Sequence, residues 1–236
     1  RPRPDGRSGR RQVGASGRGS SEVRTAQARG KAARGPALLR DIRLVGPDLG
    51  VLTSIAPEHL EGLKDLDGVA QEEGALLQEM PEDGLAILNG DDAYLRKIAA
   101  ISRPRVLFTG SSGDVDLRFC DVTVLPDGLS FVVNQSTLFQ VPVLGKHNAA
   151  NAVLAIAVCR RLGFEMEEIR KRFISFRPAA MRMARERAGN WILINDAYNS
   201  NPASALAAAE YLGSMTDREE RVLVLGEMKE LGEHAD

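Results

Sequence analysis

Short apolar runs that alternate with helix-like stretches are the feature that most constrains how this chain folds. A short, mostly apolar run bounded by turn residues is typical of a strand that is buried on both faces of a parallel sheet. Strand–helix–strand units of the length found here form right-handed parallel crossovers. The sequence therefore predicts an α/β fold with parallel sheets, and it places strands at residues 49–55, 85–88, 105–108, 191–195 and 221–225.

The stretches between these runs have helical spacing, and one segment departs from the pattern. Residues 119–143 contain three alternating segments, of which the first two are joined by Pro-Asp-Gly, so we expect an antiparallel meander there. The string FRPAA at 176–180 suits a join between two domains, which we place at 41–177 and 178–236. Helices are predicted at 67–80, 92–100, 148–162, 165–176 and 204–215.

Residues 1–40 have the composition of a disordered segment. Ten Arg and one Lys stand there against Asp5 and Glu22, with no aromatic residue and almost no Ile, Leu or Val. Such a segment buries too little apolar area to offset its ordering entropy. Two alternatives stay open, an artefact of cloning or gene prediction and an arm that binds nucleic acid. The second lacks the interleaved aromatic residues that would support it.

The remaining composition excludes several classes of protein. Hydrophobic residues make up 43% and charged residues 27%, as in an ordinary globular protein. The longest apolar stretch, 149–159, is far shorter than the roughly 20 residues of a membrane span, and no secretory signal follows the basic N-terminal residues. Cys120 and Cys159 form neither a disulfide scaffold nor a paired metal motif, so we expect a cytoplasmic protein. Because the chain begins with Arg1 and stops just after a strand-like run, we expect a fragment.

Polar and acidic residues repeatedly follow the predicted strands. Ligands of open parallel sheets bind beyond the carboxyl ends of the strands, so these residues are the first candidates for a site. Asn151 on an apolar helix and Asp196 at the end of a buried strand each need a partner. The strings that follow the strands and the meander are APEHLE (56–61), NGDD (89–92), GKHN (145–148), NDAYNSNP (195–202) and GEM (226–228).

Most of these residues also have a structural interpretation, which the sequence leaves open. His59 suits a turn after Pro57, and Asn148 suits a helix cap. Asp91 and Asp92 form a loop that a helix cap alone would explain. The residues from Asn199 to Asn201 suit a turn before a helix that starts at Pro202.

Five strings taken together resemble the Mur ligases of peptidoglycan synthesis, and within them the branch that adds D-alanyl-D-alanine. The strings are TSIAPEHLEGL (53–63), LNGDD (88–92), GKHNAANAVLAIA (145–157), INDAYNSNPAS (194–204) and LGEMKELGEHA (225–235). The resemblance implies a partial central ATP-binding domain at 41–177 and the start of a Rossmann-like C-terminal domain at 178–236.

The resemblance also implies a reaction and its reactants. A UDP-N-acetylmuramoyl tripeptide and D-alanyl-D-alanine would be joined through an acyl phosphate, with ATP and Mg²⁺ as cofactors and with no membrane or nucleic-acid partner. We expect a monomer. By motif position the catalytic residues would be His59, Arg182 and Asp196, and the metal ligands His59 and Glu73. The nucleotide would contact His147, Asn148, Asn151, Arg182 and Asp196, and the dipeptide Tyr198, Asn199, Asn201 and Ser204.

The chain departs from the family pattern at several positions. It contains no Gly-Lys-Ser/Thr string, and 14–21 keeps only the glycine spacing of a phosphate loop. Ser54 replaces an Asn, and Met181 replaces a Gly before Arg182. Glu73 stands where many relatives carry a lysine whose carbamate binds a second Mg²⁺. An exposed helix glutamate beside Glu72 is the structural alternative.

These departures keep two other functions open. One is a non-catalytic remnant or nucleotide-binding module of the same fold, which the missing phosphate-loop lysine favours. The other is a sister ligase for another amino acid, such as an enzyme of the folylpolyglutamate type. The string at 194–204 speaks against the sister ligase.

Overall fold

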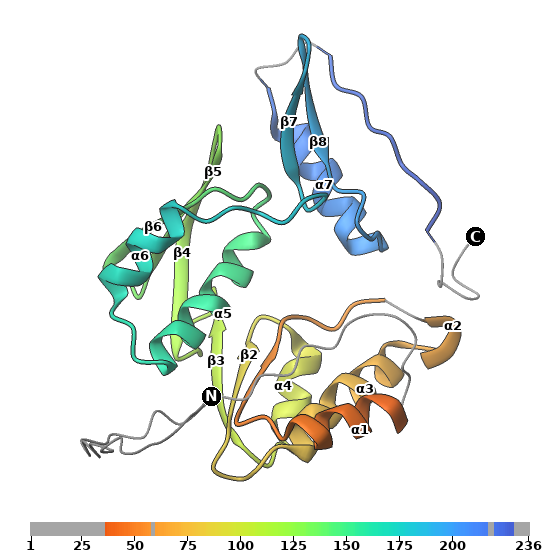
Figure 1. The fold of residues 1–236 in the computed structure, drawn as a ribbon, viewed down its shortest axis with the longest axis vertical. Helices are drawn as coiled ribbons and strands as arrows, with labels where there is room; N and C mark the ends of the chain where they lie inside the picture. The colour runs from red at the N-terminus through yellow and green to blue at the C-terminus, as the bar shows by residue number, and fades with distance from the viewer. Residues whose placement is uncertain (1–35, 58–59, 217–219, 229–236) are drawn as a thin grey trace, which may run out of the picture.

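The computed structural model describes residues 36–57, 60–216 and 220–228 (Figure 1). Their main element is a six-stranded sheet in which the strands follow one another in chain order. The first four strands are parallel, and the fourth continues into an antiparallel meander with the last two. The strands are β1 (Leu49–Leu52), β2 (Leu85–Asn89), β3 (Arg105–Gly110), β4 (Leu117–Leu125), β5 (Gly128–Val133) and β6 (Thr137–Val141). The α/β prediction and the predicted meander are confirmed.

Helices cover both faces of the parallel part of the sheet (Figure 1). Ala86 and Leu88 of β2 point towards one face and pack with α3 (Leu66–Glu79) and α4 (Ala93–Ala99). Ile87 points towards the other face and packs against α5 (Asn148–Arg161). Because successive side chains of a strand alternate between faces, an unbroken apolar run is the pattern that two covered faces require. The α5 and α6 (Met166–Ile174) helices also cover the meander.

The first described helix, α1 (Pro36–Val45), was not predicted. It includes residues 36–40, so the prediction of disorder is wrong for these five, whereas residues 1–35 lie outside the described residues. Ile42 is buried. Arg43 forms a bidentate salt bridge with Glu79 of α3, in which both N–O distances are 2.7 Å. The α1 helix thus packs on α3, and the local composition did not predict it. The short helix α2 (Leu60–Leu63) was also missed.

The C-terminal part contains a hairpin of β7 (Ala184–Ala188) and β8 (Trp191–Asn195), followed by α7 (Pro202–Ser214). The predicted parallel crossover from β8 to 221–225 is wrong for the described residues. The partner of β8 is β7, in antiparallel register, and residues 221–225 form no ladder with any described strand. The string ARERA of β7 was not predicted as a strand because it has no apolar alternation.

None of the helices in the described part of the chain has both the length and the apolar character that a bilayer crossing requires. The other predicted helices match α3, α4, α5, α6 and α7, with ends that differ by a few residues.

Candidate functional site

Two neighbouring carboxylates connect the loop after β2 to the loops after β1 and β3. Asp92 caps α4, because its Oδ1 accepts hydrogen bonds from the backbone N–H of Tyr94 (2.8 Å) and Leu95 (3.1 Å). Its Oδ2 also accepts from the N–H of Ile55 in the loop after β1 (2.7 Å). The structural interpretation of Asp92 as a cap is therefore confirmed. The bond to Ile55 was not predicted, since nothing local links positions 37 residues apart.

Asp91 holds the loop that follows β3. It accepts hydrogen bonds from the N–H and the hydroxyl of Ser111 (2.7 and 2.9 Å) and from the N–H of Ser112 (3.1 Å). Burial opposes ionisation of Asp91, but these hydrogen bonds outweigh it and hold the pKa of the carboxyl below its usual value. Gly110 leaves room for this carboxylate, because a Cβ there would lie 2.8 Å from Asp91 Oδ1. Hydrogen bonds to Asp91 and Asp92 thus connect the loops that follow β1, β2 and β3 at one edge of the sheet.

The amino end of α5 lies at this same edge. Its last turn, at Arg160 and Arg161, lines a cleft together with Leu85 and Arg105, the first residues of β2 and β3. The helix therefore runs antiparallel to the strands, and its positive dipole end points to where their carboxyl ends lie. An amino terminus of this kind suits an anionic ligand.

Two asparagines on the first turn of α5 form a pair. Asn148 Nδ2 donates to the carbonyl of Leu144 (2.7 Å), and Asn148 Oδ1 accepts from Asn151 Nδ2 (3.0 Å). The side chain of Asn148 therefore does not cap the helix, and the N-cap residue His147 makes no side-chain capping bond. Asn151 has the partner that its place on an apolar helix requires, and its exposed side chain faces solvent.

The β7–β8 hairpin brings together residues that lie well apart in the sequence. Ala184 is paired with Asn195, so the residues just before β7 meet those just after β8. The Arg182 guanidinium lies over the Tyr198 ring, 4.1 Å from its centroid. Asp196 Oδ1 accepts from the N–H of Met183 (3.0 Å), which holds the residue next to Arg182. The structure thus places Arg182, Asp196 and Tyr198 together.

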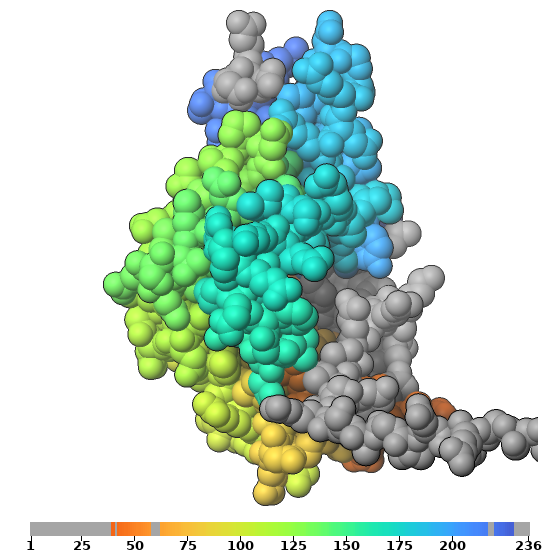
Figure 2. Space-filling view, turned by 60° about the vertical axis from the view of Figure 1, so that its left-hand side comes forward, coloured from red at the N-terminus to blue at the C-terminus, as the bar shows by residue number. Residues whose placement is uncertain are grey.

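The hairpin and α7 rest on the end of the meander (Figure 2). Leu144, just before α5, is buried in a cluster with Met183 and Tyr211. Burial of the His147 ring lowers its pKa, and the carboxylates of Asp196 and Glu210 oppose that change. Leu144 packs with Met183, and its carbonyl accepts a hydrogen bond from Asn148, so the nucleotide candidates of α5 and of the hairpin unit lie on either side of this contact.

The backbone on both sides of Arg182 is left-handed. The φ angles of Met181 and Met183 are +57° and +50°. Glycine adopts this conformation freely, whereas it costs other residues about 1–2 kcal/mol. The Gly that the family pattern has at position 181 is therefore what the local backbone favours, and Met181 is held there by the surrounding structure.

The other predicted site residues lie at the start of α7, on α3 or outside the described residues. Asn201 and Ser204 form a reciprocal capping box at the start of α7, in which Asn201 Oδ1 accepts from Ser204 N (2.7 Å) and Ser204 Oγ accepts from Asn201 N (3.0 Å). The turn interpretation of this pair is confirmed, and Asn199 lies exposed beside it. Glu73 is half-buried on α3, whereas His59 lies outside the described residues. Among the described residues, no three His, Cys, Asp or Glu side chains form a metal-binding group.

Comparison with known proteins shows to which family the chain is related. The model of the Mur ligase middle domain matches residues 32–159. The chain belongs to the Mur ligase family. A UDP-N-acetylmuramoyl-tripeptide–D-alanyl-D-alanine ligase of Bacillus subtilis is 33% identical over 194 residues, which are 81% of this chain and 42% of that protein. This chain thus spans less than half the length of that relative.

Solved structures share the fold of this Mur ligase chain. MurF from Acinetobacter baumannii superposes with a TM-score of 0.79 at 24% identity, over 86% of this chain and 45% of that one. MurF from Thermotoga maritima, in complex with ADP, gives a TM-score of 0.74 at 22% identity, over 86% and 47% of the two chains. The likeness extends over both the sheet and the C-terminal hairpin unit, since it includes most of the chain.

Proposed function

We propose that this chain is part of an ATP-dependent ligase that joins D-alanyl-D-alanine to a UDP-N-acetylmuramoyl tripeptide in peptidoglycan synthesis. The observation that carries the proposal is the contact between the two units, where Met183, which lies next to Arg182 and is held by Asp196, packs with Leu144, whose carbonyl is bound by Asn148 of α5. The names of the relatives supply the substrates. Since the reaction uses ATP, we place it in the cytoplasm.

The reaction forms one amide bond in two steps. A carboxylate oxygen of the tripeptide attacks the γ-phosphorus of ATP, ADP leaves, and an acyl phosphate results. The amine nitrogen of the dipeptide then attacks the acyl carbon and loses a proton, and inorganic phosphate leaves from a tetrahedral intermediate. Catalysis of this kind depends on holding anions in line and on neutralising their charge.

We assign the following tasks to the residues of this chain. Asn148 and Asn151 contact the nucleotide beside the positive end of α5. His147, the N-cap residue of this helix, contacts it as well. Arg182 supplies a fixed positive charge to the phosphates, and Asp196 positions it through the backbone of Met183. Closure of the hairpin unit over α5 excludes water from the acyl phosphate. The residues proposed to place the dipeptide are Tyr198, Asn199, Asn201 and Ser204.

The proposal includes Mg²⁺, with Glu73 and His59 as ligands. Mg²⁺ needs only one or two protein carboxylates, because water and substrate phosphates occupy its other positions. Glu73, the described member of the pair, is a half-buried carboxylate of α3 and supplies the oxygen ligand type that Mg²⁺ prefers. When bound, the ion neutralises phosphate charge, and none of the tasks given above depends on its position.

Nucleotide binding by the whole chain tests the proposal through calorimetric titration with ADP. We expect Asn151→Ala to weaken binding about fivefold and Arg182→Ala about tenfold, which are the costs of one lost neutral or charged hydrogen bond. The matched control is Arg187→Ala, an exposed arginine of β7, which should bind like the parent chain. Equal affinity in all variants would refute the nucleotide site.

Turnover distinguishes the ligase from a binding module. The chain has no Gly-Lys-Ser/Thr string, and we therefore expect ADP binding without phosphate release from ATP when both substrates are added. Binding of D-alanyl-D-alanine but not of its L,L isomer, lost in Asn199→Ala, would support the ligase assignment. Binding of neither dipeptide would support the module. Phosphate release by this chain would contradict the expectation for its turnover.

A further inference from the structure

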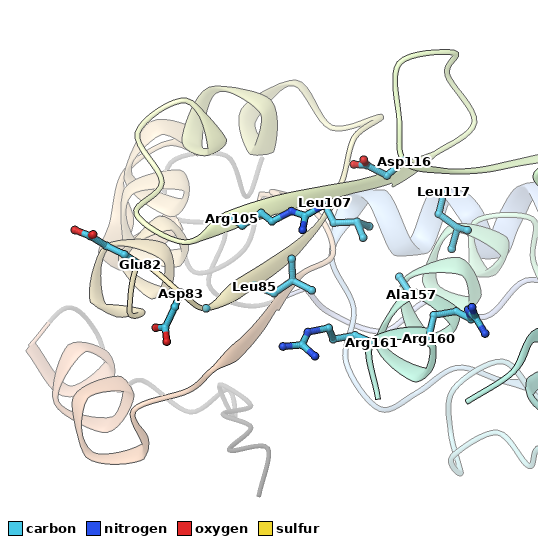
Figure 3. A pocket seen from close by; sticks show the side chains of 11 residues that line it. Glu82, Asp83, Leu85, Arg105, Leu107, Asp116, Leu117, Ala157, Arg160 and Arg161 are labelled. Carbon is cyan, nitrogen blue, oxygen red and sulfur yellow. The ribbon is translucent and has the colours of Figure 1, made fainter. Parts of the chain in front are cut away.

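An open cleft lies at the opposite end of the sheet from the candidate nucleotide site. It is formed where β2 and β3 begin and where α5 ends (Figure 3), and its volume is about 670 Å³. Small-molecule sites have volumes of about 300–1,000 Å³ and are mainly apolar with a few polar groups. The floor of the cleft is apolar, with Leu85, Leu107, Leu117 and Ala157.

Two arginines at the cleft have no partner among the described residues. The guanidinium group of neither Arg105 nor Arg161 makes a hydrogen bond or ion pair with another described residue. Figure 3 shows their guanidinium groups on opposite sides of Leu85, whereas Arg160 turns away. Arg160 donates to the carbonyl of Phe164 and to Glu165 (2.8 and 2.9 Å). Arg161 also suits the negative end of α5, but Arg105 begins a strand and has no such role.

None of the three acidic residues of the cleft forms an ion pair with these two arginines. Asp116 accepts a hydrogen bond from the N–H of Phe108 (2.8 Å), and Glu82 faces Arg103 at 3.9 Å. Asp83 and Asp116 keep their negative charges, and in Figure 3 the carboxylate of Asp83 points away from Leu85. The cleft therefore combines an apolar floor with two guanidinium groups that form no ion pair with a described carboxylate.

We propose that this cleft binds a small amphipathic anion, with its apolar body on the leucine floor and its phosphate or carboxylate group between Arg105 and Arg161. Guanidinium groups match the planar, multiple acceptors of such anions, and each can donate two hydrogen bonds to them. The floor adds affinity in proportion to the apolar area that the ligand covers. The site is separate from the one proposed for ATP, because the two lie at opposite ends of β2 and β3.

Calorimetric titration of the whole chain with phenyl phosphate tests this proposal. We expect binding, with a Kd that rises at least about tenfold in the double variant Arg105→Gln/Arg161→Gln, since both charged donors are lost. Inorganic phosphate should bind at least about tenfold more weakly than phenyl phosphate, because it does not cover the floor. Removal of one negative charge from the cleft in Asp83→Asn should strengthen binding.

Two controls separate this cleft from other arginines and from the nucleotide site. Arg187→Gln should leave the Kd for phenyl phosphate unchanged, and saturating ADP should not displace the ligand. Circular dichroism would verify that each variant is folded. No binding of phenyl phosphate at millimolar concentration, equal binding by the double variant, or displacement by ADP would overturn the proposal.

Discussion

The two parts of the molecule, residues 36–176 and residues 177–228, differ in how they are stabilised. The first part has several clusters of buried apolar side chains on both faces of its sheet. From the second part only Met183 and Tyr211 are among the described buried apolar residues, and both pack on Leu144 of the first part. The first part therefore has a core of its own, whereas the second depends on contact with its neighbour.

The segment at 221–225 makes this difference clearest. It has the same apolar character as β2, yet Val224 is 86% exposed, whereas Ile87 and Leu88 of β2 are fully buried. An apolar run indicates that a segment can form a strand, but a ladder requires a neighbouring strand in register. The neighbour of β8 among the described residues is β7, so the apolar run at 221–225 remains unpaired.

We expect the largest effect from a substitution that disrupts the core of the first part. Phe131 is fully buried and is stacked on Phe139, with 5.8 Å between ring centroids. We expect Phe131→Ala to lower the free energy of unfolding by about 3–5 kcal/mol, measured by urea denaturation. Its counterpart in the second part, Leu193→Ala, should change that free energy by less than about 1 kcal/mol, because Leu193 is 47% exposed. Similar losses in both variants would contradict the difference between the two parts.

Helix caps offer a second comparison, because Asp92 caps a helix of the first part and Asn201 caps a helix of the second. Asp92→Ala removes the cap of α4 and leaves the N–H of Ile55 without its acceptor, so we expect a loss of about 2 kcal/mol. Asn201→Ala removes only the capping box of α7, and we expect about 1 kcal/mol. Thermal denaturation would measure both. Asp114→Ala, whose side chain is almost fully exposed, is the control and should stay within about 0.5 kcal/mol. A smaller loss for Asp92 than for Asn201 would show that the bond to Ile55 contributes nothing.

The sequence was sufficient where the chemistry is local or periodic. The apolar run of β2 predicted two covered faces, and the residues from Asn199 to Asn201 predicted a turn before a helix that starts at Pro202, which α7 confirms. It was insufficient where a contact joins distant segments. The bond from Ile55 to Asp92 and the ion pair of Arg43 with Glu79 depend on how elements pack, and no local pattern encodes them. The strand β7 was missed for the same reason, since its pairing with β8, and not its composition, defines it.

In the candidate site, too, the residue types could be predicted from local sequence, whereas the contacts between distant segments could not. Its residue types were recognisable as strings after strands, and Asn151 and Asp196 have the partners that their positions require. The stacking of Arg182 on Tyr198 follows only from the hairpin, which brings the start of β7 to the end of β8. The roles of these residues stay predictions until binding is measured.

The smallest expected effect concerns the join between the two parts, at Met181. Its φ of +57° carries a steric cost of about 1–2 kcal/mol, and glycine would remove that cost but lose about 0.5–1 kcal/mol more entropy on folding. We therefore expect Met181→Gly to stabilise the protein by about 0.5 kcal/mol, measured by urea denaturation. Met181→Ala is the matched control, because it removes the same long side chain but keeps the Cβ that causes the strain, and it should bring no gain. If both variants were equally stable, the left-handed backbone at 181 would not be a source of strain, and the weakness of the second part would have to come from its small buried area alone.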